Sequence, residues 1–586
     1  MATTAENKTQ EKLSPMKALD ARFKALADKR SLVDPTTREI AENLLPHRTD
    51  FLINGNPDQK DRGRMNQNLL ASDAVLAART CSSGLMANVT NPATPWFALG
   101  AQNRSLNKIA AVQGWLYDVN EILLDILENS NFYRQMPSHY YDVLGFGTAV
   151  TIIERSVKNL IKFTTLAWGS YVLGVNGDGE VDTIFRDEIY TILNLVCTFC
   201  KMDKNGNYDL SNLVKTTAED FKKGVDGQKV EVTVRHAVYP NPKYDPTRPY
   251  GETRQYLSKY WETNQSGNEE VFLREEGFNY FPVMCSRWNV RPGEIYGRDF
   301  PAEMVVGDIK QLYKLTEDEN YGIEVSMEPP LTGPAAVKDG IIDRSPGGYT
   351  PDGGDSRTGI RSLYEVKFNM EFLLKKREEL KYIINKGFFV DILLALTNST
   401  KEKTAEESRY IKDESMMEFG PVTQSFQSML RLLIDVLFDF ALDAGMVPPT
   451  PPEIAGQPLR PEFIGPFALA QKLSGLGPIE RAIHIITAIA EISPAILDKF
   501  NVDVTADEIS KILHLPPGMI NADDVANAIR QHRAQAQAAT TSTQDLKNTA
   551  DAAQTLSETE VNGVPALDKL LSMTRTGAPA PRVNAA

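Results

Sequence analysis

The sequence is poor in the residues on which disulfide frameworks and metal sites depend. Its 586 residues include only four cysteines and six histidines. Four scattered cysteines favour a reducing compartment over a disulfide framework. The histidines have no paired spacing, so we expect each of them to be structural: His47, His139, His236, His484, His514 and His532. The sequence therefore predicts no metal site and no cofactor.

Two short motifs resemble metal sites but lack essential ligands. Cys197 and Cys200 have the spacing of half a zinc site, yet no second Cys or His pair follows at a fitting distance. Their apolar context, LNLVCTFCK, favours two packed thiols. The segment DKNGNYD resembles a calcium loop, but Tyr208 replaces the required Gly and Val214 replaces the final Glu. A surface turn is the better interpretation.

The sequence also lacks long apolar runs, a net positive charge and a phosphate-binding loop. The sequence contains no run of about twenty apolar residues, so we expect no membrane-spanning segment. The start, MATTAENKTQEK, has no apolar core for a secretory signal. The net charge of −14 argues against a protein that grips nucleic acid, because phosphate binding needs clustered Lys and Arg. The Gly-rich segment 347–354 lacks a following Gly-Lys-Ser/Thr. We predict that the protein is not an enzyme.

The apolar periodicity predicts a helical start followed by a β-rich part. Asp34 and Pro35 begin a helix that ends before Pro46. Three- and four-residue spacing predicts helices within 62–90 and 104–128. Period-two patterns then predict strands, with turns at Asn176-Gly177 and Asp178-Gly179. These strands lie in the following segments: GTAVTIIER, KFTTLAWGSYVLGVNGDGEVDTIF, KVEVTVRHAVY and residues 255–290.

The second half is predicted as helices around a Gly- and Pro-rich excursion. A capping box at Thr404 and Glu407 starts one long helix, which Gly420-Pro421 must kink. The predicted order is a helix from Pro301 to about 326, a loop over 327–364, an apolar helix over 365–396, the break TNSTKEK, the kinked helix to about 444, and a helical region over 466–500. The end, from about 534, is rich in Ala, Thr and Gln.

The segment NVTNPATPWFALG interrupts the helical start with two prolines, directly before Trp96 and Phe97. We expect these two aromatic side chains to be core anchors, held by prolines that redirect the chain between two packed helices. An elbow of this kind would be structural in any helical domain.

Five stretches of the sequence are characteristic when taken in order: LASDAVLAARTCSSGLMANVTNPATPWFALG, FYRQMPSHYYDVLGFGTAVTIIE, RWNVRPGEIYGRDFPAEMVVGDIKQLYKLTEDE, KGFFVDILLAL and EFGPVTQSFQSMLRLLIDVLFDFALDAGMVPP. In this order they resemble the portal (head-to-tail connector) protein of short-tailed bacteriophages. The resemblance covers most of residues 40–500.

The resemblance implies an α+β fold that is predominantly helical, in an elongated portal subunit with wing, stem, clip and crown regions. On this chain, the implied regions are an N-terminal arm at 1–40, a wing at 41–300, stem helices at 301–326 and 365–396, a clip at 327–364, a channel loop at 397–403, a kinked helix and wing return at 404–500, a crown at 501–540 and a low-complexity tail at 541–586.

The resemblance also implies a function in the virion. Identical subunits, commonly twelve, would form a ring at one capsid vertex, through which double-stranded DNA is packaged and ejected without sequence preference. Implied partners are the major capsid protein, the terminase motor and tail adaptor proteins, with no membrane, and assembly would occur in the host cytoplasm. The acidic balance fits a channel that DNA passes without sticking. The alternatives are another head-tail or tail adaptor component, or a packaging-motor enzyme; the missing phosphate loop argues against an ATPase.

Two segments are candidate sites. Short polar and basic side chains in the predicted channel loop would contact phosphate oxygens of DNA weakly: Thr397, Asn398, Ser399, Thr400, Lys401 and Lys403. Charged and aromatic side chains in the predicted clip would dock other virion proteins: Arg344, Tyr349, Asp352, Asp355, Arg357 and Arg361. The alternatives are an ordinary turn between helices for the first segment and a solvated loop for the second.

Overall fold

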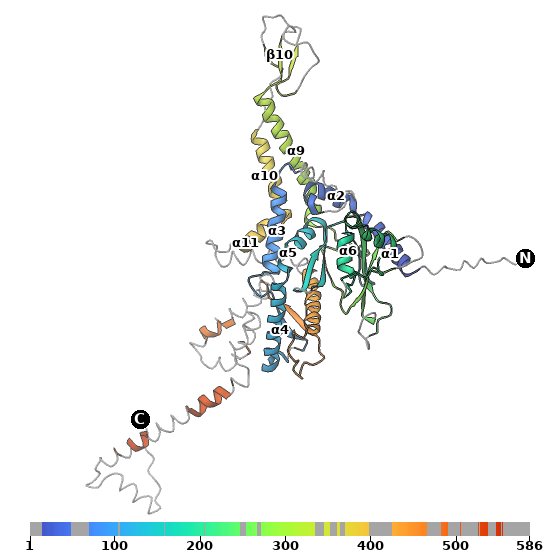
Figure 1. Ribbon diagram of the computed structural model, residues 1–586. Coiled ribbons are helices and arrows are strands. Elements are labelled where there is room, and N and C mark those ends of the chain that lie inside the picture. The colour runs from blue at the N-terminus through green and yellow to red at the C-terminus, as the bar shows by residue number, and fades with distance from the viewer. Residues whose placement is uncertain are drawn as a thin grey trace, which may run out of the picture. The chain divides into compact units, whose positions relative to one another are not determined.

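A computed structural model describes residues 14–48, 69–103, 106–156, 159–203, 206–245, 253–265, 271–333, 345–351, 360–363, 370–397, 425–465 and short pieces between 482 and 554 (Figure 1). Helices make up 52% of the described residues, which confirms a mixed α+β fold with more helix than strand. Within these residues, no helix has both the length and the apolar character needed to cross a membrane.

The chain divides into two compact units. The first comprises residues 1–102 and 115–499, and the second comprises 103–114 and 500–586. Within the second unit, the described residues include a 3-10 helix, Leu106–Lys108, and helical pieces at 528–536 and 547–551. All other elements described below belong to the first unit, apart from the first residues of α4.

Five helices form most of the N-terminal part: α1 (Pro15–Ser31), α2 (Asp34–Asn43), α3 (Asp73–Val89), α4 (Ala110–Asn129) and α5 (Phe132–Phe146). The predicted start of α2 is confirmed, and a 3-10 turn at Pro46–Arg48 follows its end. The helix predicted over 62–90 begins only at Asp73; its first predicted residues lie outside the described ones. No element was predicted for α5, which contains Pro137 in its interior.

The aromatic elbow is a core anchor, as predicted, and it opens a strand that was not predicted. Trp96 and Phe97 are fully buried, and the Trp96 ring stacks on those of Phe132 and Phe463. Strand β1 (Phe97–Ala101) pairs antiparallel with β13 (Leu459–Phe463), so that Phe97 lies opposite Phe463. A partner this distant in the chain leaves no local pattern, which is why the sequence did not reveal the strand.

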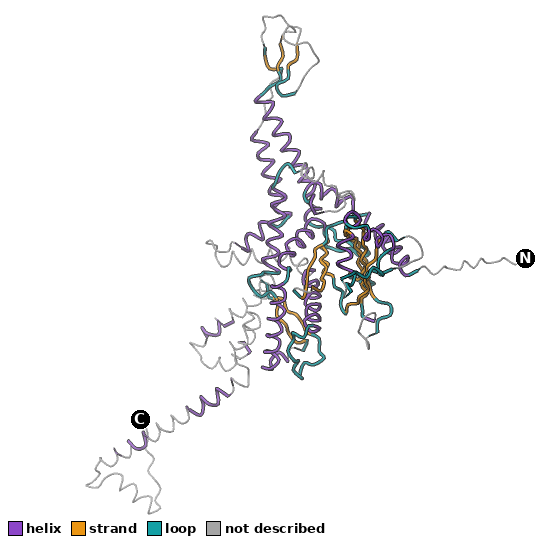
Figure 2. The backbone as a smooth tube through the Cα atoms, in the orientation of Figure 1, coloured by secondary structure: helices purple, strands orange, loops and turns teal. Residues whose placement is uncertain are grey.

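The β-rich part, residues 148–287, contains two antiparallel sheets (Figure 2). The three-stranded sheet has the order β3-β2-β9, with β2 (Thr148–Ser156), β3 (Leu160–Thr165) and β9 (Val283–Arg287). The five-stranded sheet has the order β4-β5-β6-β7-β8, with β4 (Tyr171–Val175), β5 (Val181–Thr191), β6 (Glu231–Pro240), β7 (Tyr256–Glu262) and β8 (Arg274–Phe278). These strands confirm the period-two prediction.

The turn chemistry predicted between β4 and β5 is also confirmed. The side-chain oxygen of Asn176 accepts hydrogen bonds from the backbone N–H groups of Asp178 and Glu180, each at 2.9 Å. Gly179 has φ +80°, a left-handed conformation that side chains disfavour. The local residues therefore determine this hairpin.

Three short helices cover one end of the five-stranded sheet: α6 (Ile192–Phe199), α7 (Lys215–Lys222) and α8 (Val225–Gln228). They enclose an apolar core that includes Ile192, Leu195 and Val234. The buried Glu262 carboxylate accepts hydrogen bonds from the Val214 N–H, at 2.8 Å, and from the Thr217 hydroxyl. Glu262 thereby accepts a hydrogen bond from a backbone N–H group that has no partner within the first turn of α7. Burial raises the pKa of the Glu262 carboxyl.

The two motifs that resembled metal sites differ in the placement of their side chains. Cys200 is buried, with its Sγ 3.3 Å from Asn212 Oδ1, whereas Cys197 is exposed. The prediction of two packed thiols is therefore right for Cys200 and wrong for Cys197, because only one side of α6 faces the core. The described residues of the DKNGNYD segment lie in a turn at the surface, as predicted, where Met202 and Tyr208 form an isolated bridge. No group of three metal-ligating side chains occurs among the described residues.

The second half contains a long helix followed by two shorter ones: α9 (Pro301–Met327), α10 (Met370–Gly387) and α11 (Val390–Thr397). The predicted helix from Pro301 is confirmed. The single helix predicted over 365–396 is wrong, because Phe389 has φ +55° and ends α10. The buried Phe388 and the stacking of Phe389 on Trp288, with ring centroids 6.1 Å apart, hold this break in place.

A further helix occupies residues 425–443 and leads to β13 through the proline-rich segment. Its buried face includes Phe426, Leu430 and Leu437. The predicted kink at Gly420-Pro421, the capping box before it and most of the helical region predicted over 466–500 lie outside the described residues.

Candidate functional site

The helices α9 and α10 form an antiparallel pair that contacts α2 and α3 and extends away from the two sheets towards β10 (Figure 1). They approach closely because Gly387 lacks a side chain: a Cβ atom there would lie 2.3 Å from Val305 Cγ1. Ile309 and Leu312 of α9 and Leu380 and Ile384 of α10 are almost fully buried. Close packing of apolar side chains therefore sets the spacing of this helix pair.

Polar contacts attach the helix pair to the N-terminal helices. The Tyr313 hydroxyl donates to the Asn43 carbonyl at 2.8 Å, and Lys310 forms an ion pair with Glu39 at 2.8 Å. Lys381 of α10 lies 3.2 Å from Asp73 of α3. Further along the pair, Arg377 and Glu319 join the two helices at 3.2 Å.

A small sheet lies at the end of α9, in the region that the sequence predicted as a loop. Strand β10 (Leu331–Gly333) pairs in parallel with β11 (Tyr349–Pro351) and antiparallel with β12 (Arg361–Ser362). The sheet is tied to α9 because the Gly347 N–H donates to the Glu328 carbonyl at 2.7 Å. Strands of two or three residues are too short to leave a recognisable pattern in the sequence.

Two of the six predicted docking residues fall on this β10–β12 sheet. Tyr349 is half-buried on β11, and Arg361 is exposed on β12, so the fold brings them to opposite sides of β10. The remaining four lie outside the described residues: Arg344, Asp352, Asp355 and Arg357. Whether the six act together stays a prediction.

The predicted channel loop follows α11 directly. Thr397 is the last residue of α11, so the helix includes the first residue assigned to the loop. Leu393 of α11 packs against Gly84 of α3, where a Cβ atom would lie 2.8 Å from Leu393 Cδ1. This contact fixes the point from which the chain leaves the helix. Asn398, Ser399, Thr400, Lys401 and Lys403 lie outside the described residues.

The helix pair and α11 expose large apolar side chains that the sequence analysis did not single out. They are Met304, Tyr321, Ile323 and Met327 of α9, Phe372, Leu374, Tyr382 and Ile383 of α10, and Leu394 of α11. The two helices also differ in net charge, although each exposes side chains of both signs. The α9 sequence contains six carboxylates and two lysines, and the α10 sequence contains three carboxylates and five Lys or Arg side chains. The apolar stretch 365–396 predicts that neighbouring copies cover part of this helix, but its spacing did not show which side chains stay exposed.

Long packed helices join the mixed α+β body to the small β10–β12 sheet, and their exposed apolar side chains are typical of a protein that assembles with others. The family described as bacteriophage head to tail connecting protein matches residues 16–520. A probable portal protein of Bordetella phage BPP-1 is 31% identical over 535 residues, covering 90% of this chain and 93% of that protein. The portal protein of Salmonella phage epsilon15 is 28% identical over 558 residues, covering 94% and 97%.

The chain therefore belongs to the bacteriophage head-to-tail connecting proteins. Its function is that of a phage portal protein, which makes it a component of the virion. The resemblance of the five sequence stretches to this family is confirmed.

Proposed function

We propose that copies of this chain form a closed ring, a dodecamer, at one vertex of the capsid. Double-stranded DNA passes through the centre of the ring during packaging and ejection. The ring contacts the major capsid protein, the terminase motor docks on it during packaging, and tail adaptor proteins bind it later. Assembly takes place in the host cytoplasm, and the protein performs no catalysis of its own.

The observation that carries this proposal is the uncovered surface of the helix pair. Both α9 and α10 expose large apolar side chains outside the face on which the two helices pack together. Contiguous apolar surface on a soluble protein marks a contact with another molecule. In a ring, each subunit presents one of its flanks to one neighbour and the other flank to the next.

The charges of the helix pair support the same arrangement. The net charge of α9 is negative, with six carboxylates and two lysines, and that of α10 is positive, with three carboxylates and five Lys or Arg side chains. When the α9 flank of one copy meets the α10 flank of the next, the opposite net charges of the two helices attract each other. Such complementarity selects the register and the direction of a head-to-tail contact.

The remaining regions are assigned from the resemblance to the portal family. Residues 301–326 and 365–396 form the stem, and 327–364 form the clip, where Tyr349 and Arg361 contribute to docking. Residues 41–300 form the wing, 397–403 the channel loop, 404–500 the kinked helix that returns to the wing, and 501–540 the crown. The net charge of −14 keeps DNA phosphates from adhering along the channel.

Native mass measurement of the purified full-length protein tests the proposal. We expect a single assembly with the mass of twelve chains of 65.1 kDa each. A protein that stays strictly monomeric at micromolar concentration would contradict the ring. A defined ring of another subunit number would keep the channel and correct the dodecamer.

A further inference from the structure

Gly307 lies in the interior of α9, on an exposed side of the helix. Its backbone is helical, so no left-handed conformation requires a glycine there. A Cβ atom at this position would meet no atom of the described residues within 4 Å, apart from its own helix backbone. Because glycine destabilises the interior of a helix relative to alanine, Gly307 weakens α9 without improving the packing of the described part of the chain.

Other glycines inside the helices of this chain have a packing partner. At three such positions, an added Cβ atom would overlap a side chain of another element, so the glycine permits a close approach. They are Gly84 against Leu393, Gly145 against Leu45 and Gly387 against Val305. Among the described residues, Gly307 has no neighbour of this kind. Gly114 of α4 has none either, but it lies at the boundary between the two compact units.

Gly307 faces away from α10. It lies two residues from Val305 and from Ile309, which are buried on the α10 side, and two residues correspond to about 200° around a helix. The flank towards α2 is occupied by Lys310 and Tyr313. Exposed side chains three or four residues apart continue the Gly307 side of α9: Met304, Gln311, Lys314, Asp318 and Tyr321. Gly307 is therefore a gap in a surface that side chains otherwise cover.

The outward side of α10 carries a large side chain and a positive charge. Tyr382 lies two residues from the buried Leu380 and Ile384, so the same spacing places it opposite the contact with α9. Lys386, about one turn later, is also exposed. The turn between Tyr382 and Lys386 is thus available to another chain.

The gap on α9 and this turn of α10 lie at the same height of the helix pair. The close approach of Gly387 to Val305 sets Lys386 level with the turn of α9 that contains Gly307. Copies in a ring are related by rotation about its axis, so parts at equal height meet when the helix pair runs along that axis. Asp308 follows Gly307, so this contact brings unlike charges together, in line with the opposite net charges of the two helices.

We propose that Gly307 is the point at which α9 of one copy and α10 of the next copy approach most closely. The turn of the neighbouring α10 from Tyr382 to Lys386 lies over the gap at Gly307, and the Lys386 ammonium group pairs with Asp308. This inference rests on the ring proposed above and names the residues that join one copy to the next. The missing side chain of Gly307 serves the ring as that of Gly387 serves the helix pair within one chain.

Substitutions of Gly307 should act in opposite directions on the free subunit and on the ring. Gly307→Ala removes a helix-destabilising glycine and has room within one chain, so the denaturant midpoint of the free subunit should rise. The same substitution should weaken the ring, because the added side chain overfills the contact. Gly307→Leu should raise the concentration at which half of the chains are assembled by about tenfold or more, as measured by native mass across a dilution series. Ala25→Leu, at an exposed position of α1, is the matched control and should leave this concentration unchanged.

Disulfide trapping tests the contact directly. In a Cys197→Ser background, which removes the exposed thiol, Gly307→Cys with Lys386→Cys should link neighbouring chains into a ladder of covalent oligomers after oxidation. The two positions of one chain should not link, because Gly307 faces away from its own α10. Gly307→Cys with Lys375→Cys is the control: Lys375 lies about 17 Å further along α10, and a disulfide requires Cα atoms about 4–7 Å apart.

The outcomes separate this contact from the ring itself. A strictly monomeric unaltered protein would contradict the proposed ring and, with it, this contact. If the unaltered protein forms a ring, two results would each overturn the inference and leave the ring standing. One is that Gly307→Leu assembles as Ala25→Leu does. The other is that Gly307→Cys with Lys386→Cys gives no more linked chains than the control pair.

Discussion

The β-rich part and the helix pair bury their side chains to very different extents. Trp168, Trp261 and Phe185 of the β-rich part are no more than 1% exposed. On the helix pair, by contrast, Met327 is 78% exposed and Phe372 is 63% exposed. The β-rich part also exposes large apolar side chains, Ile189, Met202 and Val225 among them, but they are spread over a much longer stretch of chain. By contrast, α9 and α10, 27 and 18 residues long, together expose eight of the large apolar side chains described. The difference separates what stabilises the subunit from what joins it to others.

Charged groups show the same contrast. In the body of the molecule, Arg48 pairs with Asp142, whose side chain is only 3% exposed. On the helix pair, Lys314 and Glu317 form an ion pair 3.1 Å long with both side chains more than 60% exposed. Exposed pairs of this kind contribute about 0–1 kcal/mol each to stability. The helix pair is therefore held by its packed seam and not by its surface charges.

The largest expected effect is the loss of an anchor in the body. Trp96→Ala would remove a fully buried side chain that stacks on two other rings, and such truncations lower the free energy of unfolding by about 3–5 kcal/mol. Phe372→Ala, on the exposed surface of α10, should change it by less than about 0.5 kcal/mol. Denaturant unfolding of both variants measures the difference, and equal losses would contradict the contrast.

A pH effect of intermediate size should come from Asp142. Burial raises the pKa of this carboxyl to about 6, more than the Arg48 guanidinium group lowers it. The folded pKa lies above the unfolded value, so this group stabilises the fold below pH 4 and loses that contribution as the pH rises to about 6. The loss is on the order of 1–3 kcal/mol.

Asp142→Asn is the variant that isolates this pH effect. It should lack the decrease between pH 4 and 6, although the loss of the Arg48 partner lowers its stability at every pH. Unfolding free energies of both proteins across this range provide the measurement. Parallel curves for the two proteins would show that Asp142 does not titrate there.

The sequence predicted those elements whose signals are local. The hairpin at Asn176–Gly179 and the start of α9 at Pro301 depend on residues within a few positions, and both are confirmed. The elements that it missed depend on distant partners. Strand β1 needs β13, and the break at Phe389 needs Trp288, which lies a hundred residues earlier. No window of sequence contains these contacts.

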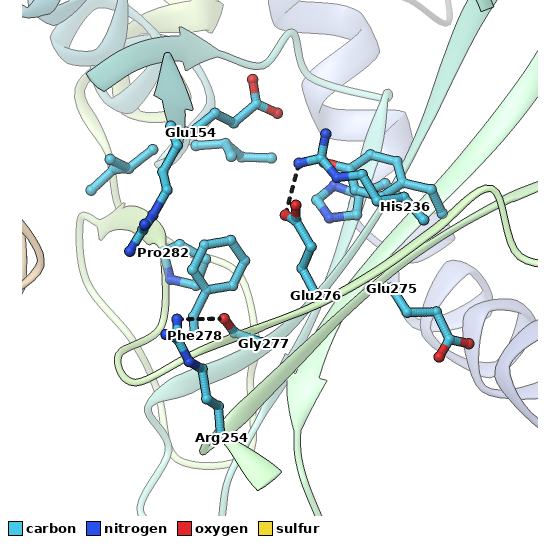
Figure 3. Close-up of a pocket in the computed structure, with 13 residues that line it drawn as sticks. Glu154, His236, Arg254, Glu275, Glu276, Gly277, Phe278 and Pro282 are labelled. Atoms are coloured by element: carbon cyan, nitrogen blue, oxygen red, sulfur yellow. Dashed lines mark hydrogen bonds and ion pairs between the residues drawn. The ribbon is translucent and has the colours of Figure 1, made fainter. Parts of the chain in front are cut away.

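The candidate sites were predictable to different degrees. Five sequence stretches taken in order, together with the layout of helix, Gly- and Pro-rich excursion and second helix, identified the family. The helix from Pro301 follows from its own pattern. The β10–β12 sheet was not predictable, because its strands contain two or three residues and are held by pairing across a long excursion. The cavity between the two sheets of the β-rich part (Figure 3) has no sequence signal either, since Arg254, Phe278 and Ile152 meet only through the packing of these sheets.

A smaller effect on the subunit, but a large one on assembly, is expected at the helix pair. Tyr321→Ala with Tyr382→Ala would remove exposed rings from α9 and α10, so the free energy of unfolding of the subunit should change by less than about 1 kcal/mol. The native mass should shift from the ring towards free subunits. Tyr244→Ala, an exposed tyrosine of the β-rich part, is the control and should leave the ring intact. A double variant with a normal ring would exclude this surface as the subunit contact.

Changes in the predicted clip, residues 327–364, should affect neither folding nor ring formation. Deleting residues 346–354 would remove β11, so point variants are the cleaner test. Tyr349→Ala with Arg361→Ala should reduce binding of the tail adaptor or of the terminase motor, while the matched control, Tyr244→Ala with Arg291→Ala, should not. Binding of purified partners to assembled rings measures the effect. Wild-type binding by the double variant would show that the segment is a solvated loop without a docking function.

The smallest effect on the protein itself is expected at the channel loop, where the readout is DNA. Lys401→Ala with Lys403→Ala would remove two positive charges that follow α11 in an otherwise acidic chain. Each phosphate contact is weak and screened by salt, so folding and assembly should be unchanged, while DNA packaging or retention changes most at low ionic strength. Lys222→Ala with Lys229→Ala removes two exposed lysines from the β-rich part and is the matched control. Packaging assays with capsids containing each ring provide the measurement. If the Lys401 and Lys403 double variant packages and retains a full genome at the normal rate, the loop is an ordinary turn and DNA contacts another element.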